Sequence, residues 1–481
     1  MIKAIYLLVL TLGLTQSVAN YQNTISHEEN EYQNIKHKGL LSDYLKIFVD
    51  SNKYVNASAV LWDSTDYRIN KGPDAWEQLF LFDGHVWGKL SPELSFKSHF
   101  RITTEYASTP VGNHDFDPNN GIAFSPQAKN KKTWDLFNAR TDYTLPNLIL
   151  SAGVDYLNFS PSKRNSLVWS GNTNRFRPWQ DTAHALTQSA PVAFLSWKAL
   201  LGNLEYSQYL GKLSQRKAQN KYFHTHRLEW VSPKFTLALS EHIIYGDLDS
   251  SQTLDREVDA SKRDIQWTYI MPFVPYFFAE HYNGDLDNSA ISLDASYTHK
   301  GFKPYFELLI DDLKGPTGFF DDSWWGNKFA FSVGFEYQTN YASKPAIIFE
   351  YTRIEPWVYT HSFGNGYSMT HFNKPLGSDL GPNSQEFYIE GIITPLADLK
   401  LNTWSSWVLK GYNAGSSANS IYFKKDGEGK EWIPEDQRNE YIEAGLGFEY
   451  QISNYLQLTS QLSYYFNQES IRSSSTLKLF F

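Results

Sequence analysis

The stretch Glu93–Tyr106, ELSFKSHFRITTEY, alternates apolar and polar side chains with a period of two. This period predicts a β-strand whose two faces differ in character. One face carries the apolar residues Leu94, Phe96, Phe100, Ile102 and Tyr106. The opposite face carries Ser95, Lys97, His99, Arg101, Thr103 and Glu105. Full charges on the polar face suit a wet lumen and the apolar face suits lipid, so we predict a strand of a transmembrane β-barrel.

The same pattern returns near the carboxyl terminus in Tyr441–Tyr450 and in Leu456–Phe466. The chain then ends in TLKLFF, where Leu477, Leu479 and Phe481 share one face. An apolar final strand that closes on Phe is similar to the last strand of bacterial outer-membrane proteins. A single alternating strand would also fit a soluble sandwich, but long strands with a charged face that recur along the chain favour a barrel.

Short and long connections alternate between the predicted strands. The short ones lie near Leu90–Glu93, Leu145–Asn147, Leu201–Asn203, Val231–Lys234, Lys300–Phe302, Thr394–Ala397 and Ser453–Tyr455. The long polar ones are Ala107–Thr133, Leu157–Ala190, Gly211–Tyr222, Gly246–Arg263, Asp312–Asn327, Glu355–Asn383 and Lys410–Arg438. In outer-membrane barrels, periplasmic turns are tight and extracellular loops are free to grow. We therefore predict an all-β, antiparallel up-and-down transmembrane barrel with an even number of strands, about 18 (18–20).

Two stretches are harder to assign from the pattern. Tyr54–Trp62 reads as a weak strand. Pro272 and Pro275 interrupt an otherwise apolar stretch, and because proline cannot donate a hydrogen bond to a neighbouring strand, we predict a turn there.

The composition agrees with a barrel and excludes several other classes. Aromatic residues make up 16% of the 481 residues, whereas the hydrophobic fraction is only 41%. A soluble core would need a matching share of aliphatic residues, but a barrel can place aromatics in girdles at the membrane interfaces. The absence of cysteine excludes disulfides, thiolate metal sites and a cysteine nucleophile. A formal charge of -9 without a basic stripe argues against a nucleic-acid partner.

The amino terminus predicts export. Lys3 precedes the apolar stretch Ile5–Leu14, and Ser17-Val18-Ala19 supplies a small-x-small cleavage pattern. We predict a signal peptide over residues 1–19, with a single membrane anchor as the alternative. The polar residues 20–53 predict a periplasmic extension, and residues 54–481 predict the barrel in the cell outer membrane.

Three blocks resemble the family of the capsule assembly protein Wzi. They are Ser151–Trp179 (SAGVDYLNFSPSKRNSLVWSGNTNRFRPW), Phe306–Asp312 (FELLIDD) and Glu350–Gly391, whose PLG and LG elements at Pro375-Leu376-Gly377 and Leu380-Gly381 are the most specific part. The resemblance implies an eighteen-stranded outer-membrane barrel that acts as a lectin and helps to organise capsular polysaccharide. It is convincing only across these blocks.

The long connections contain residues suited to sugar binding. Aromatic faces can cover the apolar face of a pyranose, and arginines pair with carboxylates of acidic polysaccharides. The candidates are Arg164, Trp169, Arg175, Arg177, Trp179, Trp324, Trp325, Trp357, Tyr359 and Tyr367. Alternatively, the aromatics belong to the interfacial girdle or pack within loops, and the arginines pair with Asp181 or with lipopolysaccharide. We expect a monomer that binds capsular or exopolysaccharide and contacts outer-membrane lipid and lipopolysaccharide.

Three other interpretations of the sequence are a channel, an enzyme and a calcium-binding loop. A charged lumen and a large strand number also fit a porin or substrate-specific channel. His361 and His371 share a connection with Glu355 and Asp379, but no spacing among them marks a nucleophile or a metal site, so we predict no enzyme activity and no cofactor. Asp115–Gly121 places oxygen ligands at alternate positions like a calcium loop, yet Pro126 stands where a closing Glu would be needed, so a solvated turn is favoured.

Overall fold

The computed structural model describes residues 53–68, 72–107, 116–117, 121–123, 130–170, 190–214, 220–247, 263–284, 286–313, 326–420 and 430–480. The predicted signal peptide and all but the last residue of the predicted periplasmic extension lie outside this part of the chain. Most of the Asp115–Gly121 stretch also lies outside it. No helix among the described residues is long and apolar enough to cross a membrane.

The described residues form a 20-stranded antiparallel sheet, of which β4 (Phe116–Asp117) and β5 (Gly121–Ala123) are a short hairpin beside β6. The other eighteen strands are β1 (Lys53–Arg68), β2 (Gly72–Lys89), β3 (Leu94–Ala107), β6 (Lys131–Leu145), β7 (Leu148–Asp155), β8 (Val192–Leu201), β9 (Leu204–Lys212), β10 (Lys221–Val231), β11 (Phe235–Gly246), β12 (Asn288–Tyr297), β13 (Phe302–Asp312), β14 (Lys328–Gln338), β15 (Ala346–Ile354), β18 (Ser384–Leu396), β19 (Leu399–Gly411), β20 (Arg438–Ser453), β21 (Leu456–Tyr465) and β22 (Ser470–Phe480).

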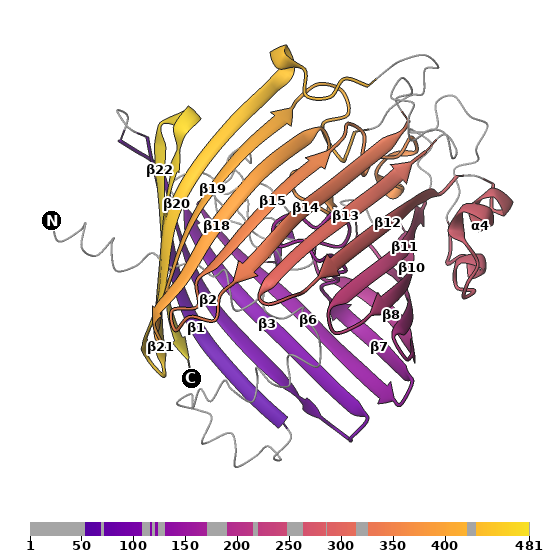
Figure 1. Ribbon diagram of the computed structural model, residues 1–481, viewed down its shortest axis with the longest axis horizontal. Coiled ribbons are helices and arrows are strands. Elements are labelled where there is room, and N and C mark those ends of the chain that lie inside the picture. The colour runs from indigo at the N-terminus through magenta and orange to yellow at the C-terminus, as the bar shows by residue number, and fades with distance from the viewer. Residues whose placement is uncertain are drawn as a thin grey trace.

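These eighteen strands close into a ring (Figure 1). Each pairs with the next one along the chain, and β1 pairs with both β2 and β22, so that Asp63 lies opposite Ser475 at the seam. Closure gives every strand two neighbours, which is the condition for backbone polar groups to be satisfied inside a bilayer. The predicted antiparallel up-and-down barrel with an even number of strands is confirmed.

The strands of the ring point polar side chains inward and apolar side chains outward, the reverse of a soluble protein. On β3, His99, Arg101 and Glu105 are buried toward the lumen, whereas Phe100 and Ile102 are 40% and 48% exposed on the outside. The predicted division of Glu93–Tyr106 into two faces is therefore confirmed. Exposed apolar side chains continue around the outer wall, among them Phe80, Phe137, Leu195, Leu239, Val333, Ile389, Leu446 and Leu462.

The connections divide between the two ends of the ring. All seven predicted short links overlap turns at one end, and the structure adds an eighth at residues 339–345. The weak strand predicted at Tyr54–Trp62 is the longer β1. The link that we placed at Gly246–Arg263 extends to Asp287 and contains the 3-10 helix η3 (Trp267–Tyr269) and α4 (Tyr276–Tyr282), and Pro272 and Pro275 lie in the bend between them, as predicted.

A charge on the outer face should cost far more stability than the same charge in the lumen. Leu446 is 62% exposed on the outer face of β20, and Leu446→Arg should lower the free energy of unfolding by about 2–4 kcal/mol near the bilayer midplane. The matched control is Thr459→Arg on β21, which lies opposite Glu449 on the lumen side. Urea unfolding in lipid vesicles measures both, and equal losses would contradict this assignment of faces.

Candidate functional site

The link between β7 and β8 enters the lumen instead of leaving the barrel. Its described first half, residues 156–170, bends back on itself, with Asn158 bridged to Ser170. Glu307, which projects inward from β13, accepts hydrogen bonds from the Ser160 hydroxyl and from the Leu167 backbone N–H. The link is thus attached to the wall at a point far from it in the sequence.

Glu350 on β15 holds the next part of the link. Its carboxylate is 1% exposed and accepts the backbone N–H groups of Lys163, Arg164 and Asn165 at 2.9, 2.9 and 2.6 Å. The hydroxyls of Ser162 and Tyr305 donate to the same carboxylate at 2.7 and 2.8 Å. A buried carboxylate is costly unless its oxygens accept hydrogen bonds, and here the link supplies most of the donors.

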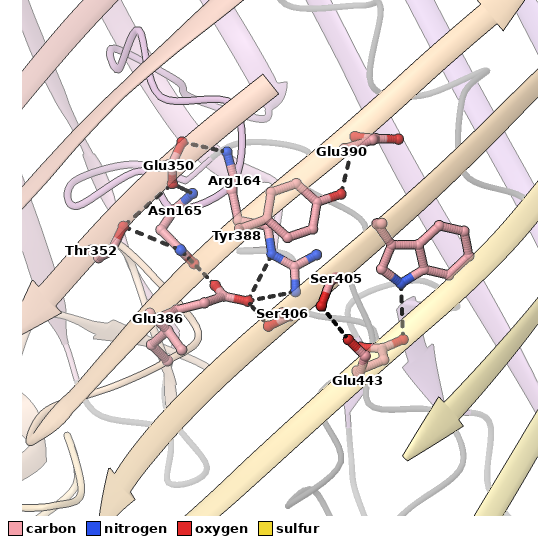
Figure 2. A network of polar contacts seen from close by, with 12 residues as sticks. Arg164, Asn165, Glu350, Thr352, Glu386, Tyr388, Glu390, Ser405, Ser406 and Glu443 are labelled. Atoms are coloured by element: carbon pink, nitrogen blue, oxygen red, sulfur yellow. Dashed lines mark hydrogen bonds and ion pairs between the residues drawn. The ribbon is translucent and has the colours of Figure 1, made fainter. Parts of the chain in front are cut away.

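Glu386 on β18 completes the attachment (Figure 2). Arg164 donates to it from Nη2 at 2.7 Å and from Nε at 3.0 Å, and Asn165 donates from Nδ2 at 2.7 Å. Ser406 donates to the same carboxylate at 2.6 Å, and the Arg164 guanidinium lies 4.2 Å from the ring centre of Tyr388. Both charged groups are buried, so removing either would leave the other without its ionic partner.

The link between β15 and β18, residues 355–383, packs on the first one. The Tyr359 hydroxyl donates to the Leu167 carbonyl at 2.8 Å, and the Ser170 N–H donates to the Leu376 carbonyl at 2.8 Å. A Cβ at Gly377 would lie 1.9 Å from the Leu167 carbonyl oxygen, so only glycine permits this approach. The two links therefore form one unit, which we call the plug: residues 156–170 and 355–383.

An apolar core joins the plug to the wall. Phe194, Phe223, Ile244, Leu309 and Ile354 contribute from the strands, and Leu167, Trp169, Val358, Tyr359, Met369, Leu376 and Leu380 contribute from the plug. The ring centres of Trp169 and Phe223 are 4.5 Å apart. Close packing of apolar side chains leaves no room for ordered water between them, so the plug is joined to this part of the wall without a water layer.

His371, in the short strand β16 (Thr370–His371), ties the plug to the β9–β10 link and to the end of the β7–β8 link. The Ser214 N–H donates to His371 Nδ1 at 2.9 Å, and Nε2 lies 3.1 Å from the Pro191 carbonyl, to which it donates. Burial lowers the pKa of His371 to about 4, although the hydrogen bond to Pro191 opposes this, and Lys221 contributes to the lowering. The imidazole is therefore neutral at pH 7, with its proton on Nε2.

The link between β19 and β20 also contacts the plug. Lys430 forms an ion pair with Glu355, and the Trp357 N–H donates to the Gly415 carbonyl at 2.9 Å. The Asn383 side chain donates to Ser416 and accepts from the Ile433 N–H. Glu355 and His371 lie in the same link but have different partners: Glu355 pairs with Lys430, and His371 contacts Ser214 and Pro191.

The predicted sugar-binding residues fall into two groups. Arg164, Trp169, Tyr359 and Tyr367 are buried, and the rings of Trp169 and Tyr367 are covered by Phe223 and Phe363, while Trp357 is half-buried. In this arrangement the four buried side chains hold the plug and do not present a free face. The other candidates, Arg175, Arg177, Trp179, Trp324 and Trp325, lie outside the described residues.

Sequence reasoning missed the three carboxylates that anchor the plug. Glu307 lies within one of the blocks that resemble the Wzi family, Phe306–Asp312, and Glu350 and Glu386 both lie within another, Glu350–Gly391. Each occupies a lumen-facing position of a strand, where a charge by itself suggests only a wet interior. The sequence did place acidic residues on the inward faces of neighbouring strands. It could not show what they bind, because the partners of these carboxylates lie more than 100 residues away along the chain.

Comparison with known proteins defines the class. No family model and no curated protein sequence matches the chain. Among solved structures, the fold is similar to Wzi from Escherichia coli, described as a carbohydrate-binding outer-membrane β-barrel involved in group 1 capsule assembly, with 12% identity, 98% of this chain and 94% of that chain covered, and a TM-score of 0.53. A BenF-like porin from Pseudomonas fluorescens matches with 9% identity over 89% of this chain and 98% of that one, with a TM-score of 0.46. The chain is an outer-membrane β-barrel protein.

Acidification should loosen the plug at His371. A folded pKa of about 4 lies below the value of about 6.5 for an exposed histidine, so the opened link binds the proton first. The stability of this contact is complete above about pH 6.5 and falls as the pH drops toward 4. Hydrogen exchange of the Phe372 and Ser214 amides should therefore accelerate between pH 7 and pH 5, after correction for intrinsic exchange.

The variant His371→Asn keeps an acceptor near the Ser214 N–H but does not titrate, so it should abolish the acid-dependent part of this acceleration. His299→Asn, in the exposed turn at residues 298–301, is the control and should leave it unchanged. An acid response that persists in His371→Asn would assign the effect to another group.

Proposed function

We propose that this barrel binds and organises capsular or exopolysaccharide at the cell surface and that it does so without an enzymatic step. The observation that carries the proposal is the plug. Two links that enter the lumen pack on each other and on the wall, and so form a rigid support for the long connections. Such a support suits a surface that holds a large polymer outside the cell.

The residue types that follow the first part of the plug in the sequence support the same proposal. Residues 171–189, which include Arg175, Arg177 and Trp179, begin directly after Ser170, whose N–H is bonded to Leu376. Ala190, which follows them, is 1% exposed and precedes Pro191, whose carbonyl His371 contacts. The described residues on either side of this stretch therefore both contact the plug or adjoin a residue that does. Arginine forks and tryptophan faces are the groups that bind acidic sugars.

The likeness to Wzi supports the proposal from a second direction. That protein is described as carbohydrate-binding, and the alignment extends over nearly the whole of both chains. At 12% identity it carries the fold, and the choice of polysaccharide rests on residues of this chain.

A substrate-specific channel is the second candidate. The lumen wall also carries ion pairs, including Lys97 with Asp155 at 2.9 Å and the buried pair Arg227 with Asp294 at 2.6 Å. Charged groups that line a lumen are also found in channels that select their solutes. Conductance separates the two functions because a binding platform needs no open path.

Binding of an acidic capsular polysaccharide to the purified barrel should weaken when aromatic candidates are removed. The double variant Trp324→Ala with Trp325→Ala should raise the Kd about tenfold, equivalent to a loss of about 1.4 kcal/mol of binding free energy. Trp230→Ala removes an exposed indole at the short-turn end and should leave the Kd unchanged. Isothermal titration calorimetry measures the Kd, and equal affinities in the three proteins would count against the proposal.

The intact barrel should be silent in a planar lipid bilayer, and loosening the plug should open it. Glu386→Ala leaves the Arg164 guanidinium buried without its carboxylate, at a cost of about 3–5 kcal/mol, so transient or steady conductance should appear. Glu449→Ala, on the lumen face and bonded to Gln457, is the matched control and should stay silent. A steady open channel in the unmodified protein would instead favour the channel function.

A further inference from the structure

The outer wall of the barrel carries a row of polar side chains where lipid-facing residues are expected. On β10, Phe223 and Arg227 point into the lumen, so the alternate residues His224, His226 and Leu228 point outward. His226 is paired in register with Gln208 on β9 and with Glu241 on β11. Gln208, His226 and Glu241 thus form one lateral row on the outer face, which we call the polar row.

The polar row lies at membrane depth. His226 precedes Val231, the last residue of β10 at the short-turn end, by five positions. This corresponds to about 16 Å of strand and, with a tilt of about 45°, to about 12 Å of height. The apolar band of such barrels is about 25 Å tall, so the row lies near its middle. Below the row, Leu228, Trp230, Leu237 and Leu239 are exposed as the lipid-facing surface requires.

Part of the β11–β12 link covers this row from outside. The Gln208 side chain donates to the Tyr269 and Ile270 carbonyls at 3.0 Å each, and the Tyr276 N–H donates to Glu241 at 3.2 Å. The Tyr276 ring lies 4.2 Å from the His226 ring, centre to centre. Gln208 and His226 are consequently 2% and 6% exposed. Figure 1 shows α4 outside the ring, beside β10, β11 and β12.

The covering segment, residues 264–284, turns an apolar face away from the barrel. Its exposed side chains include Trp267, Met271, Phe273, Phe277, Phe278 and Tyr282, of which Phe273 is 71% and Tyr282 91% exposed. The stretch contains no lysine or arginine, and of its two acidic residues Glu280 is buried and Asp264 is exposed at its first position, next to Arg263. A loop in water would expose charge instead of this many large apolar groups.

The attachment of the segment is rigid at the rim of the barrel. Asp287 accepts hydrogen bonds from the Tyr269 hydroxyl at 2.6 Å and from Arg263 Nη2 at 3.1 Å. Arg263 also donates to the Tyr367 hydroxyl of the plug at 3.3 Å. The segment therefore descends from a fixed point along the outer wall, and its exposed face continues the lipid-facing surface of β10 and β11.

We propose that residues 264–284 are embedded in the hydrocarbon layer of the outer membrane, where their aromatic face contacts lipid acyl chains and their inner face shields the polar row. The occupant of the face is lipid because the face is continuous with the lipid-facing wall and exposes almost no charge. Lipid would solvate the polar row poorly. Residues 264–284 cover this row and present an apolar face to the lipid in its place.

Site-directed labelling tests this placement, since the chain has no cysteine of its own. Phe278→Cys and Tyr282→Cys carry a bimane fluorophore in the barrel reconstituted into phosphatidylcholine vesicles. Because Tyr282 is 91% exposed, Tyr282→Cys should fold normally, and it provides the measurement if Phe278→Cys folds poorly. Quenching is measured with acyl-chain nitroxide lipids and with aqueous iodide. Ile291→Cys on the outer face of β12 is the lipid control, and Tyr412→Cys in an exposed link is the water control.

The expected result is nitroxide quenching equal to that at position 291, with iodide quenching severalfold weaker than at position 412. Iodide quenching as strong as at position 412 would place the segment in water and overturn the proposal. Shielding from both quenchers, together with energy transfer between labelled copies, would also overturn it, because the face would then be covered by a second copy of the chain.

Discussion

The requirement that every backbone amide inside a bilayer find a partner governs the whole molecule. A sheet meets it only by closing, and here closure depends on the pairing of β1 with β22. Closure gives each strand one face toward lipid and one toward the lumen, which is why Phe100 is exposed and its neighbour Arg101 is buried. It also places every long link at one end of the ring, because successive strands run up and down.

The inward faces of the strands line a lumen that is shielded from lipid. Charged residues that lipid would reject can stand there, and three of them, Glu307, Glu350 and Glu386, bind the backbone and side chains of a link that enters from above. Their burial would be unfavourable alone, but the donors of residues 160–167 satisfy them. Around these contacts an apolar core forms from both wall and link residues, so the lumen contains its own hydrophobic core.

The outer wall shows what happens where the alternation fails. Gln208, His226 and Glu241 take outward positions that apolar residues occupy elsewhere, and residues 264–284 lie over them. The covering segment uses backbone carbonyls and a tyrosine ring against the polar row and leaves its own apolar side chains outside. Polar side chains at this depth are thus tolerated because protein, and not lipid, surrounds them.

The sequence alone determined the barrel, its even strand number, seven of its eight short turns at one end and the two faces of the strands that alternate clearly, such as Glu93–Tyr106. These follow from a period of two and from link length, which are local properties. Only the tertiary structure decided which links turn inward, because residues 162–165 meet Glu350 across about 185 positions of chain. The same reason explains why Trp169 and Tyr359, predicted as surface aromatics, are core residues: a pattern identifies a large ring in a link, but the packing partners that cover it come from distant strands.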